Sequence, residues 1–468
     1  MFLHQFFVKG LGHASYLVGD PDRGSAAVID PRRDIDAYLT MARDEGLRLT
    51  DIFETHVHND YVSGADELRR ATGAIVHVSG RADLTRPDEP LEDGDEVRVG
   101  SLRFRVVATP GHTPDHLSFL VADLSRTDED WILLSGGALL VGTAARPDIL
   151  GGQDEARRAA RELYETLRDR IVPLPDWIEL YPTHGAGSLC GTGIGGKRWS
   201  TIGFERRHNP ALGQPDADAF TRFILEDQPS VPAHWRHMRP INQAGATPMA
   251  GLAIPRPLTP DEVAHAAGHG ATVMDVRDPD LFAAGHVPGA LSVGLGDTFG
   301  TWAGAVAPID RELVLIVDEP DHLDPAIAQL RRSGFDRIVG WLQGGMGAWA
   351  GETATLRRVA VTDVATERAT VLDVREANEW REGHAPGALH IPGAQLPNRV
   401  AEVPAGPVLV ICGSGYRSAI AASLLAATGR EEIAHVVGGM DAYRSAGLPV
   451  ATDAPDTIID RVRAEISR

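Results

Sequence analysis

The sequence predicts an α/β protein of about three domains. In residues 1 to about 225, short apolar segments of strand length alternate with helical segments. Beyond residue 257, a unit of about one hundred residues occurs twice, which indicates two copies of one domain. The chain has 468 residues, and at roughly 150 residues per domain this length allows about three domains, each with its own core.

The elements of the first part follow one another in an order that fits two sheets between outer helices, and a single α/β sheet is the alternative. We expect strands at 15–18, 26–29, 52–54, 74–78, 97–99, 104–107, 118–120 and 131–135. We expect helices at 35–45, 65–72 and 154–170, the last with Ala156, Ala159, Leu163 and Leu167 on one side.

The middle of the chain is rich in proline, and its end repeats itself. Residues 228–257 are predicted to form an ordered strap or a linker without regular structure, because prolines interrupt them throughout. In the repeat, Met274–Arg277 recurs as Leu372–Arg375, and Gly344–Met346 recurs as Gly438–Met440. The predicted domains are therefore 1–227, 258–352 and 358–454.

Composition excludes several classes of partner. The formal net charge is -20, so nucleic acid and anionic membrane are poor partners. Cys190 and Cys412 are the two cysteines of the chain, which excludes a disulfide framework and indicates a reducing compartment. No apolar run approaches the roughly 20 residues of a membrane span, and Met1–Val8 lacks the marks of a signal peptide. We expect a cytoplasmic protein.

A histidine-rich motif at Thr55–Tyr61 predicts a metal site. Residues two apart on an extended segment point to the same side, so His56, His58 and Asp60 can converge just beyond a strand. Two further motifs, Thr109–His116 and Pro182–Gly185, also follow apolar strands and carry histidines. Imidazoles held by loop backbone at strand ends can be directed at a shared ion.

These motifs, with His58–Gly64 and His184–Gly191, resemble the metallo-β-lactamase fold, and within it a persulfide dioxygenase branch fused to rhodanese domains. The resemblance covers nearly the whole chain. It implies an N-terminal αββα metallo-β-lactamase fold followed by two rhodanese-like α/β domains. It also implies one Fe(II) per chain, held by two histidines and an aspartate, which leaves positions for thiolate sulfur and dioxygen. The implied histidines are His56 and His112.

The sequence departs from this pattern at Gly137, which stands where the family has its aspartate. A metal held by two imidazoles alone binds weakly. We expect His58 to complete a three-histidine site with His56 and His112. The alternatives are a carboxylate from Asp60, Asp115 or Asp148, or a domain that no longer binds iron.

Tyr61 replaces a histidine of two-zinc hydrolases, so a binuclear zinc centre is not expected although Asp60 and His184 remain. His184 is predicted either to contact bound sulfur or to hold its loop. Cys190 is predicted to stand at the mouth of the same pocket or to be a small buried residue. Asp60, His184 and Cys190 are thus candidates for supporting the metal ligands or contacting substrate.

Cys412 is the predicted nucleophile of the second repeat. The strand Val408–Ile411 leads into a loop formed by Cys412, Gly413, Ser414, Gly415, Tyr416, Arg417 and Ser418, and a helix follows. Backbone N–H groups and the helix N-terminus favour the thiolate, with Arg417 as a possible further contributor. Four residues between Cys412 and Arg417 form a smaller cradle than that of phosphatases, which favours a sulfur atom. The resemblance to rhodaneses implies a Cys412 persulfide.

The first repeat is predicted to be catalytically degenerate. Alignment on the Gly344–Met346 and Gly438–Met440 anchors places Asp318 where Cys412 stands, and a carboxylate cannot carry sulfane sulfur. We expect this copy to pack between the two active domains, with ligand binding as the alternative.

Together with these features, the resemblance implies a sulfur-metabolism enzyme that serves sulfide detoxification. It would oxidise a low-molecular-weight thiol persulfide to sulfite at a mononuclear metal, coupled to sulfur transfer through Cys412 to or from thiosulfate. Joining both activities in one chain raises their effective concentration. One alternative is a sulfurtransferase on a metal-free scaffold, and another is a thioester hydrolase with zinc in place of iron. Partners are these sulfur compounds, without nucleic acid or membrane; a homo-oligomer is left open.

Overall fold

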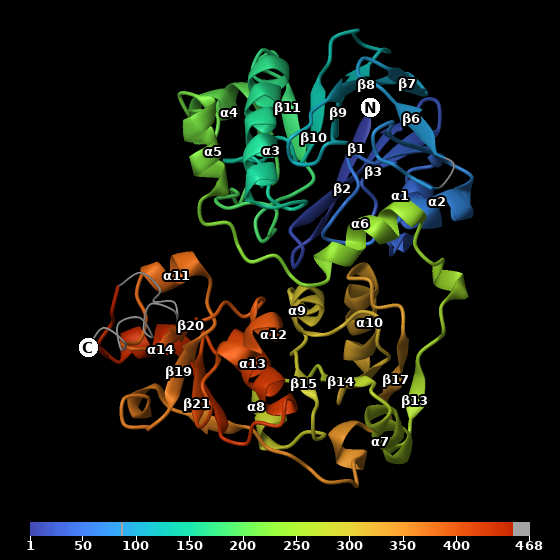
Figure 1. The fold of residues 1–468 in the computed structure, drawn as a ribbon. Coiled ribbons are helices and arrows are strands. Elements are labelled where there is room, and N and C mark those ends of the chain that lie inside the picture. The colour runs from blue at the N-terminus through green and yellow to red at the C-terminus, as the bar shows by residue number, and fades with distance from the viewer. Residues whose placement is uncertain (86–87, 453–468) are drawn as a thin grey trace. The chain divides into compact units, whose positions relative to one another are not determined.

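The computed structural model describes residues 1–85 and 88–452, and the chain forms two compact units (Figure 1). Unit 1 comprises residues 1–228, 235–251 and 331–334, and unit 2 comprises 229–234, 252–330 and the residues from 335 onward. Residues 453–454 of the predicted last domain lie outside the described residues. Among the described residues, none of the helices combines the length and apolar character of a membrane span.

Unit 1 contains two six-stranded sheets. The first consists of β1 (Phe2–Val8), β2 (His13–Asp20), β3 (Ser25–Ile29), β4 (Arg48–Phe53), β5 (Ile75–Ser79) and β6 (Glu89–Leu91), in that order. The second has the order β12 (Ser200–Thr201), β11 (Glu179–Pro182), β10 (Ile132–Gly136), β9 (Leu117–Asp123), β8 (Leu102–Ala108) and β7 (Glu96–Val99). Apolar side chains of both sheets, including stacked Phe53 and Phe104, form a shared core.

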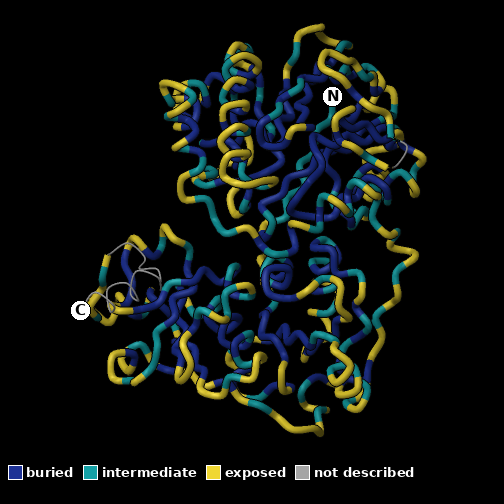
Figure 2. The backbone as a smooth tube through the Cα atoms, in the orientation of Figure 1, coloured by how far each residue is buried: buried dark blue, intermediate teal, exposed yellow. Residues whose placement is uncertain are grey.

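Helices cover the outer face of each sheet. The helices α1 (Asp36–Asp44) and α2 (Ala65–Thr72) pack on the first sheet. The second is covered by α3 (Gln153–Thr166), which continues as a π-helical turn (Leu167–Ile171), and by α5 (Ala217–Leu225), with α4 (Ile202–His208) nearby. Figure 2 shows strands between the helices in dark blue and outer helical turns in yellow. The predicted αββα arrangement is confirmed.

Two segments of unit 1 differ from the sequence-based expectation. The strand β1 was not predicted; all its residues are half-buried, so it lacks the alternating pattern of a strand with one buried face. The prediction that residues 228–257 have no regular structure was wrong in part, because they contain helix α6 (Trp235–Ala244) and a 3₁₀ turn (Met249–Gly251). Pro240 lies inside α6 on an exposed position, while Trp235, Met238 and Asn242 are buried.

Unit 2 contains two five-stranded parallel sheets with the same strand order, as expected for two copies of one domain. The first copy consists of β13 (Arg256–Leu258), α7 (Pro260–Gly268), β14 (Thr272–Asp275), α8 (Pro279–Ala284), β15 (Leu291–Ser292), α9 (Phe299–Val306), β16 (Leu313–Ile316), α10 (Leu323–Arg332) and β17 (Ile338–Leu342). The second consists of β18 (Arg357–Val359), β19 (Thr370–Asp373), α11 (Ala377–Arg381), β20 (Leu389–His390), α12 (Leu396–Arg399), β21 (Val408–Ile411), α13 (Tyr416–Ala427), β22 (Ile433–Val436) and α14 (Gly439–Ser445).

Strand register corrects the predicted alignment of the two copies. Ile316 pairs with Asp275 and Ile411 pairs with Asp373, so the residue that follows the strand is Val317 in one copy and Cys412 in the other. The placement of Asp318 at this position was therefore wrong by one residue. The cause is a bulge in β17, where the register shifts between β16 and β17, while β21 and β22 pair without a shift.

The correction leaves the first copy without a nucleophile, since valine cannot carry sulfur. Asp318 instead accepts a hydrogen bond from the Met346 N–H (2.9 Å) and lies 3.4 Å from the Arg277 guanidinium. Asp318 therefore holds the loop after β16, which corresponds to the Cys412 loop of the second copy.

The first copy packs directly against the helix that follows Cys412. The Tyr416 hydroxyl, at the start of α13, donates to the Gly294 carbonyl (2.8 Å), and the Ser423 hydroxyl accepts from the Ser292 N–H (2.9 Å). Apolar residues of both copies share one core. Within unit 2, the first copy supports α13 from one side.

Candidate functional site

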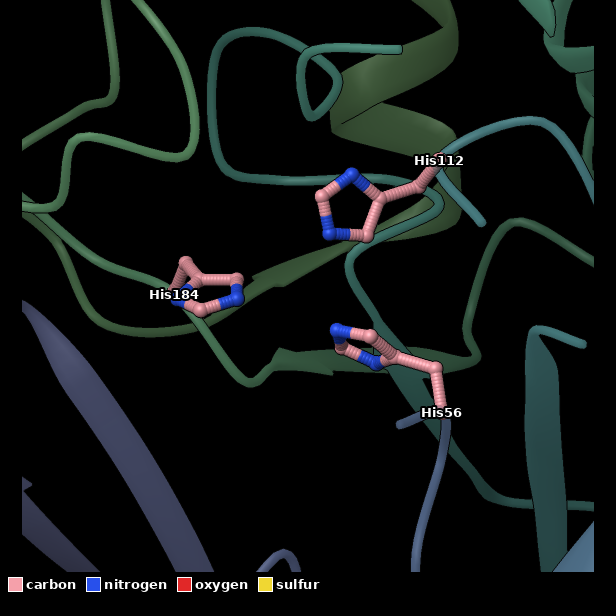
Figure 3. Close-up of side chains that lie close together, drawn as sticks. All are labelled: His56, His112 and His184. Atoms are coloured by element: carbon pink, nitrogen blue, oxygen red, sulfur yellow. The ribbon is translucent and has the colours of Figure 1, made fainter. Parts of the chain in front are cut away.

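Three imidazoles from three loops meet in unit 1. His56 follows β4, His112 follows β8, and His184 follows β11. One ring nitrogen of each lies within 4.8 Å of the others, and Figure 3 shows the three rings turned toward a common space. We call these residues the ring group. It contains the predicted ligands His56 and His112, with His184 in the third place.

Hydrogen bonds leave one nitrogen of each ring available. The His112 Nδ1–H donates to the Arg146 carbonyl (2.7 Å). The Thr55 hydroxyl donates to Asp30 (2.9 Å), so it accepts from His56 Nδ1 (2.9 Å). His184 Nδ1 lies 3.3 Å from the Ser188 hydroxyl, and its Nε2 has no hydrogen-bond partner within the described residues. All three rings can therefore present Nε2 to the shared space.

Burial keeps these rings neutral. It lowers the pKa of His112 to about 4 and the pKa values of His56 and His184 well below the usual 6.5. Neutral imidazole with its second nitrogen hydrogen-bonded is the form that coordinates metals. The ring group therefore fits a metal ion.

The space beside Gly137 is occupied by the His112 ring. A Cβ atom at this position would lie 2.5 Å from Cδ2 and 3.0 Å from Nε2 of His112, so the His112 ring occupies the space that a larger residue would need. The Gly137 N–H donates to His116 Nε2 (2.8 Å), so this nitrogen of His116 is not available to a metal.

His58 stands in a different environment from the ring group. Its Nε2 lies 3.1 Å from Asp30 and 3.2 Å from Glu54, both buried. Burial alone would lower the pKa of His58, but the two carboxyl groups raise it to about 10. Its role as a ligand stays a prediction. His58 belongs with Asp60 and His184 to a second group of possible ligands, and also with Asp30 and Glu54 to a third.

Two of the three carboxylates considered as ligands are paired elsewhere. Asp115 accepts from the Val57 N–H (2.8 Å) and forms an ion pair with Arg239 (2.9 Å). Asp148 binds the Arg146 guanidinium through both oxygens (2.7 and 2.8 Å).

Asp60 is the carboxylate that fits the site. It is buried, and neither oxygen has a hydrogen-bond partner within the described part of the chain. Burial raises its pKa to about 6. One oxygen lies 3.8 Å from His184 Nδ1. A buried carboxylate without partners is costly unless a cation or another donor satisfies it.

Cys190 and Tyr61 do not supply ligands in this arrangement. Cys190 is buried, and burial raises the pKa of its thiol well above the usual value. Its carbonyl accepts from the Arg146 N–H (2.7 Å), so its loop supports the residue that orients His112. The Tyr61 hydroxyl donates to the Asp30 carbonyl (3.2 Å), and its ring lies 4.2 Å from that of His13.

In unit 2, Cys412 lies at the point where β21 ends and a tight turn begins. The Gly415 N–H donates to Cys412 Sγ (3.1 Å), and Ser418 Oγ lies 3.5 Å from it. Gly415 has φ of 110° at the start of α13, a conformation that favours glycine. The N–H groups at this helix start can stabilise a negative sulfur.

Arg417 is held by a residue that the sequence analysis missed. Its two terminal nitrogens each lie 2.6 Å from an oxygen of Glu379. Burial would raise the pKa of Glu379, but Arg417 outweighs this and lowers it. Aligning Asp275 with Asp373 puts Leu281 at the position of Glu379. The copy that has lost the cysteine has also lost this glutamate, and this shared difference between the copies could have identified Glu379 from the sequence. Asp30 and Glu54 were also missed, because no motif marks them.

Comparison with known proteins agrees with this arrangement. Residues 8–184 match the metallo-β-lactamase superfamily, and residues 259–352 and 360–446 each match the rhodanese-like domain. The human mitochondrial persulfide dioxygenase ETHE1 is 32% identical over 213 residues, which cover 45% of this chain and 75% of that protein.

Two further matches differ in how much of the chain they cover. The crystal structure of a metallo-β-lactamase from Staphylococcus aureus has a TM-score of 0.66 and 31% identity, and the match covers 73% of this chain and 98% of that one. A hydroxyacylglutathione hydrolase from Rhodopseudomonas palustris is 46% identical over 111 residues, 23% of this chain and 43% of that protein.

We predict that His58→Ala destabilises the metal-free protein, because it leaves Asp30 and Glu54 buried without their cation. Breaking a buried ion pair costs about 3–5 kcal/mol. Since the folded-state pKa of His58, about 10, exceeds the usual 6.5, this contribution is complete below pH 6.5 and is lost as the pH rises toward 10. Urea unfolding between pH 6 and 10 measures it.

The matched control is His13→Ala. His13 is also fully buried in unit 1, but burial lowers its pKa well below the usual value, so it carries no charge. A His58→Ala variant that loses no more stability than this control, with no dependence on pH, would refute the structural role of His58.

Proposed function

The chain belongs to the metallo-β-lactamase superfamily and carries two rhodanese-like domains, and from this premise we propose that it oxidises a low-molecular-weight thiol persulfide to sulfite. The observation that supports the proposal is the ring group, in which one nitrogen of each of three neutral imidazoles lies within 4.8 Å of the others. One Fe(II) per chain is the proposed metal, with zinc as the alternative.

The proposed reaction balances without a further reductant. One persulfide RSSH, one O₂ and one water give the thiol RSH and sulfurous acid, which is sulfite at neutral pH. The outer sulfur loses four electrons and dioxygen takes up four. Bound iron would supply positions for both dioxygen and the persulfide sulfur.

The residues around the ring group have separable roles in this proposal. His56, His112 and His184 would hold the metal, and Arg146 orients His112 through its carbonyl. His58 is protonated at neutral pH, and its Nδ1 has no hydrogen-bond partner among the described residues. It can therefore donate to an anionic sulfur. Asp60, also without a partner there, can accept a proton or contact the metal.

Cys412 would perform the second reaction. Its thiolate attacks the outer sulfur of a donor, a Cys412 persulfide forms, and the remainder of the donor leaves with the electron pair. The Gly415 N–H (3.1 Å from Sγ) and the start of α13 stabilise the negative sulfur. Sulfite from the first reaction can take the sulfane sulfur as thiosulfate, or thiosulfate can supply it.

A zinc-dependent thioester hydrolase is the second candidate, because a hydroxyacylglutathione hydrolase shares 46% identity over 111 residues. Two features of the site weigh against it. Tyr61, in place of a ligand histidine, directs its hydroxyl to the Asp30 carbonyl. Gly137 supplies no carboxylate, and a larger side chain there would have to displace the His112 ring. Near-stoichiometric zinc without iron, with thioester turnover, would favour this candidate.

We predict that the two activities respond to different variants. His184→Ala should release the metal and abolish persulfide-dependent oxygen uptake, while transfer of sulfur through Cys412 persists. Cys412→Ser should do the reverse. Elemental analysis, an oxygen electrode and a thiosulfate sulfurtransferase assay measure these effects. If Cys412→Ser also abolished oxygen uptake, the chain would be a sulfurtransferase only.

We predict that Gly137→Asp lowers metal content, although it restores the residue of the family pattern. Its Cβ would lie 2.5 Å from the His112 ring, so the ring must leave its position. Elemental analysis of the purified protein measures the effect, and Gly137→Ala separates the clash from the new charge. Higher metal content in Gly137→Asp would show that the site requires a carboxylate at this position.

We predict that Glu379→Gln improves the use of thiosulfate, because Arg417 then carries an unpaired charge near Cys412. Both side chains are partly exposed, so the KM for thiosulfate should fall by roughly two- to fivefold. A persulfide donor without further negative charge should be affected less. Glu382→Gln, at an exposed position just after α11, is the control. A higher KM would show instead that Glu379 is needed to orient Arg417.

A further inference from the structure

Helix α6 lies outside the residues that match the metallo-β-lactamase superfamily, yet it belongs to unit 1. It begins 51 residues after His184 in the sequence, beyond the predicted end of the first domain. Its polar side chains contact the loops that carry His56 and His112.

Asn242 forms three hydrogen bonds with the loop that follows His56. Its Nδ2 donates to the carbonyls of His58 and Tyr61 (2.9 Å each), and its Oδ1 accepts from the Ser63 N–H (2.9 Å). The residue is buried, with 4% of its surface exposed. Both amide hydrogens and the amide oxygen are thus used on one loop.

Arg239 connects this loop with the loop of His112. Its Nη2 donates to Asp115 (2.9 Å), and its Nη1 donates to the Val57 carbonyl (3.4 Å). The other oxygen of Asp115 accepts from the Val57 N–H (2.8 Å). Val57 directly follows His56, and Asp115 lies three residues after His112, so one partly buried network joins both loops.

A small cavity lies where these contacts meet. Its lining includes His56, His58, Asp115 and Asn242. The side chain from α6 therefore forms part of the wall that also contains a member of the ring group.

We propose that α6 is an integral part of the metal centre, and that Asn242 and Arg239 are positioning residues that hold the His56 and His112 loops in register. This rests on the proposed function only in treating the ring group as a metal site. Groups that hydrogen-bond to metal ligands and orient them typically contribute about 10–100-fold to metal affinity. We expect the hydrogen bonds of Asn242 and Arg239 to act in the same way through the loop backbone.

The test uses the full chain loaded with Co²⁺, whose absorption spectrum reports the ligand geometry. Asn242→Asp keeps the size and one acceptor but places carboxylate oxygens against the carbonyls of His58 and Tyr61. We expect faster loss of Co²⁺ to a chelator, by about 10–100-fold, and a changed spectrum. Arg239→Gln should have a smaller effect of the same kind, and Arg239→Lys should recover part of it. Arg236→Ala, at an exposed position of the same helix, is the control.

The outcomes separate the inference from the proposed function. Unchanged Co²⁺ release and spectrum in both Asn242→Asp and Arg239→Gln would overturn the inference. If the variants lose Co²⁺ faster but the unmodified chain shows no persulfide-dependent oxygen uptake, the inference stands and only the proposed dioxygenase activity is refuted. If circular dichroism shows that Asn242→Asp does not fold, the inference is tested by Arg239→Gln alone. A wild-type chain that binds neither Co²⁺ nor Fe²⁺ would overturn both.

Discussion

Burial of neutral imidazoles is the constraint on which the N-terminal centre depends. His56, His112 and His184 are buried, so their charged forms are disfavoured and Nε2 keeps its lone pair. The neighbouring Thr55 hydroxyl and Arg146 carbonyl occupy Nδ1 of the first two rings. Desolvation keeps the rings neutral. The hydrogen bond from His112 Nδ1 to the Arg146 carbonyl raises the pKa of His112 and so opposes desolvation, but it fixes the tautomer that leaves Nε2 for a metal.

The same burial has the opposite result at His58, because two carboxyl groups reach its Nε2. The contrast between His56 and His58 shows that spacing along the chain does not decide the role of a histidine. Gly137 makes a related point. Its missing side chain permits the His112 ring to pack against the backbone, so loss of the acidic residue and the present ring position are parts of one arrangement.

The αββα fold and the rhodanese-like character of the two copies were predicted from the family resemblance, because periodicity alone also allowed a single α/β sheet. The repeat itself and the Cys412 loop were predicted from motifs that are contiguous in the chain. The sequence did not predict what depends on contacts between distant residues. Asp30 reaches His58 from another loop, and Asn242 reaches the same region from a proline-rich segment. A single inserted residue in β17 displaced the alignment at Asp318, because anchors on either side of a bulge no longer share one register.

The two centres control charge in different ways, and this suits their proposed chemistry. Around the ring group, burial keeps the three imidazoles neutral near pH 7, so a metal would find imidazole ligands that need not lose a proton. At Cys412, backbone N–H groups provide a fixed positive field, whereas the Arg417–Glu379 pair is partly exposed and can exchange partners with an anion. A centre that retains an ion benefits from rigidity, and one that must accept and release sulfur compounds benefits from a charge that can be redirected.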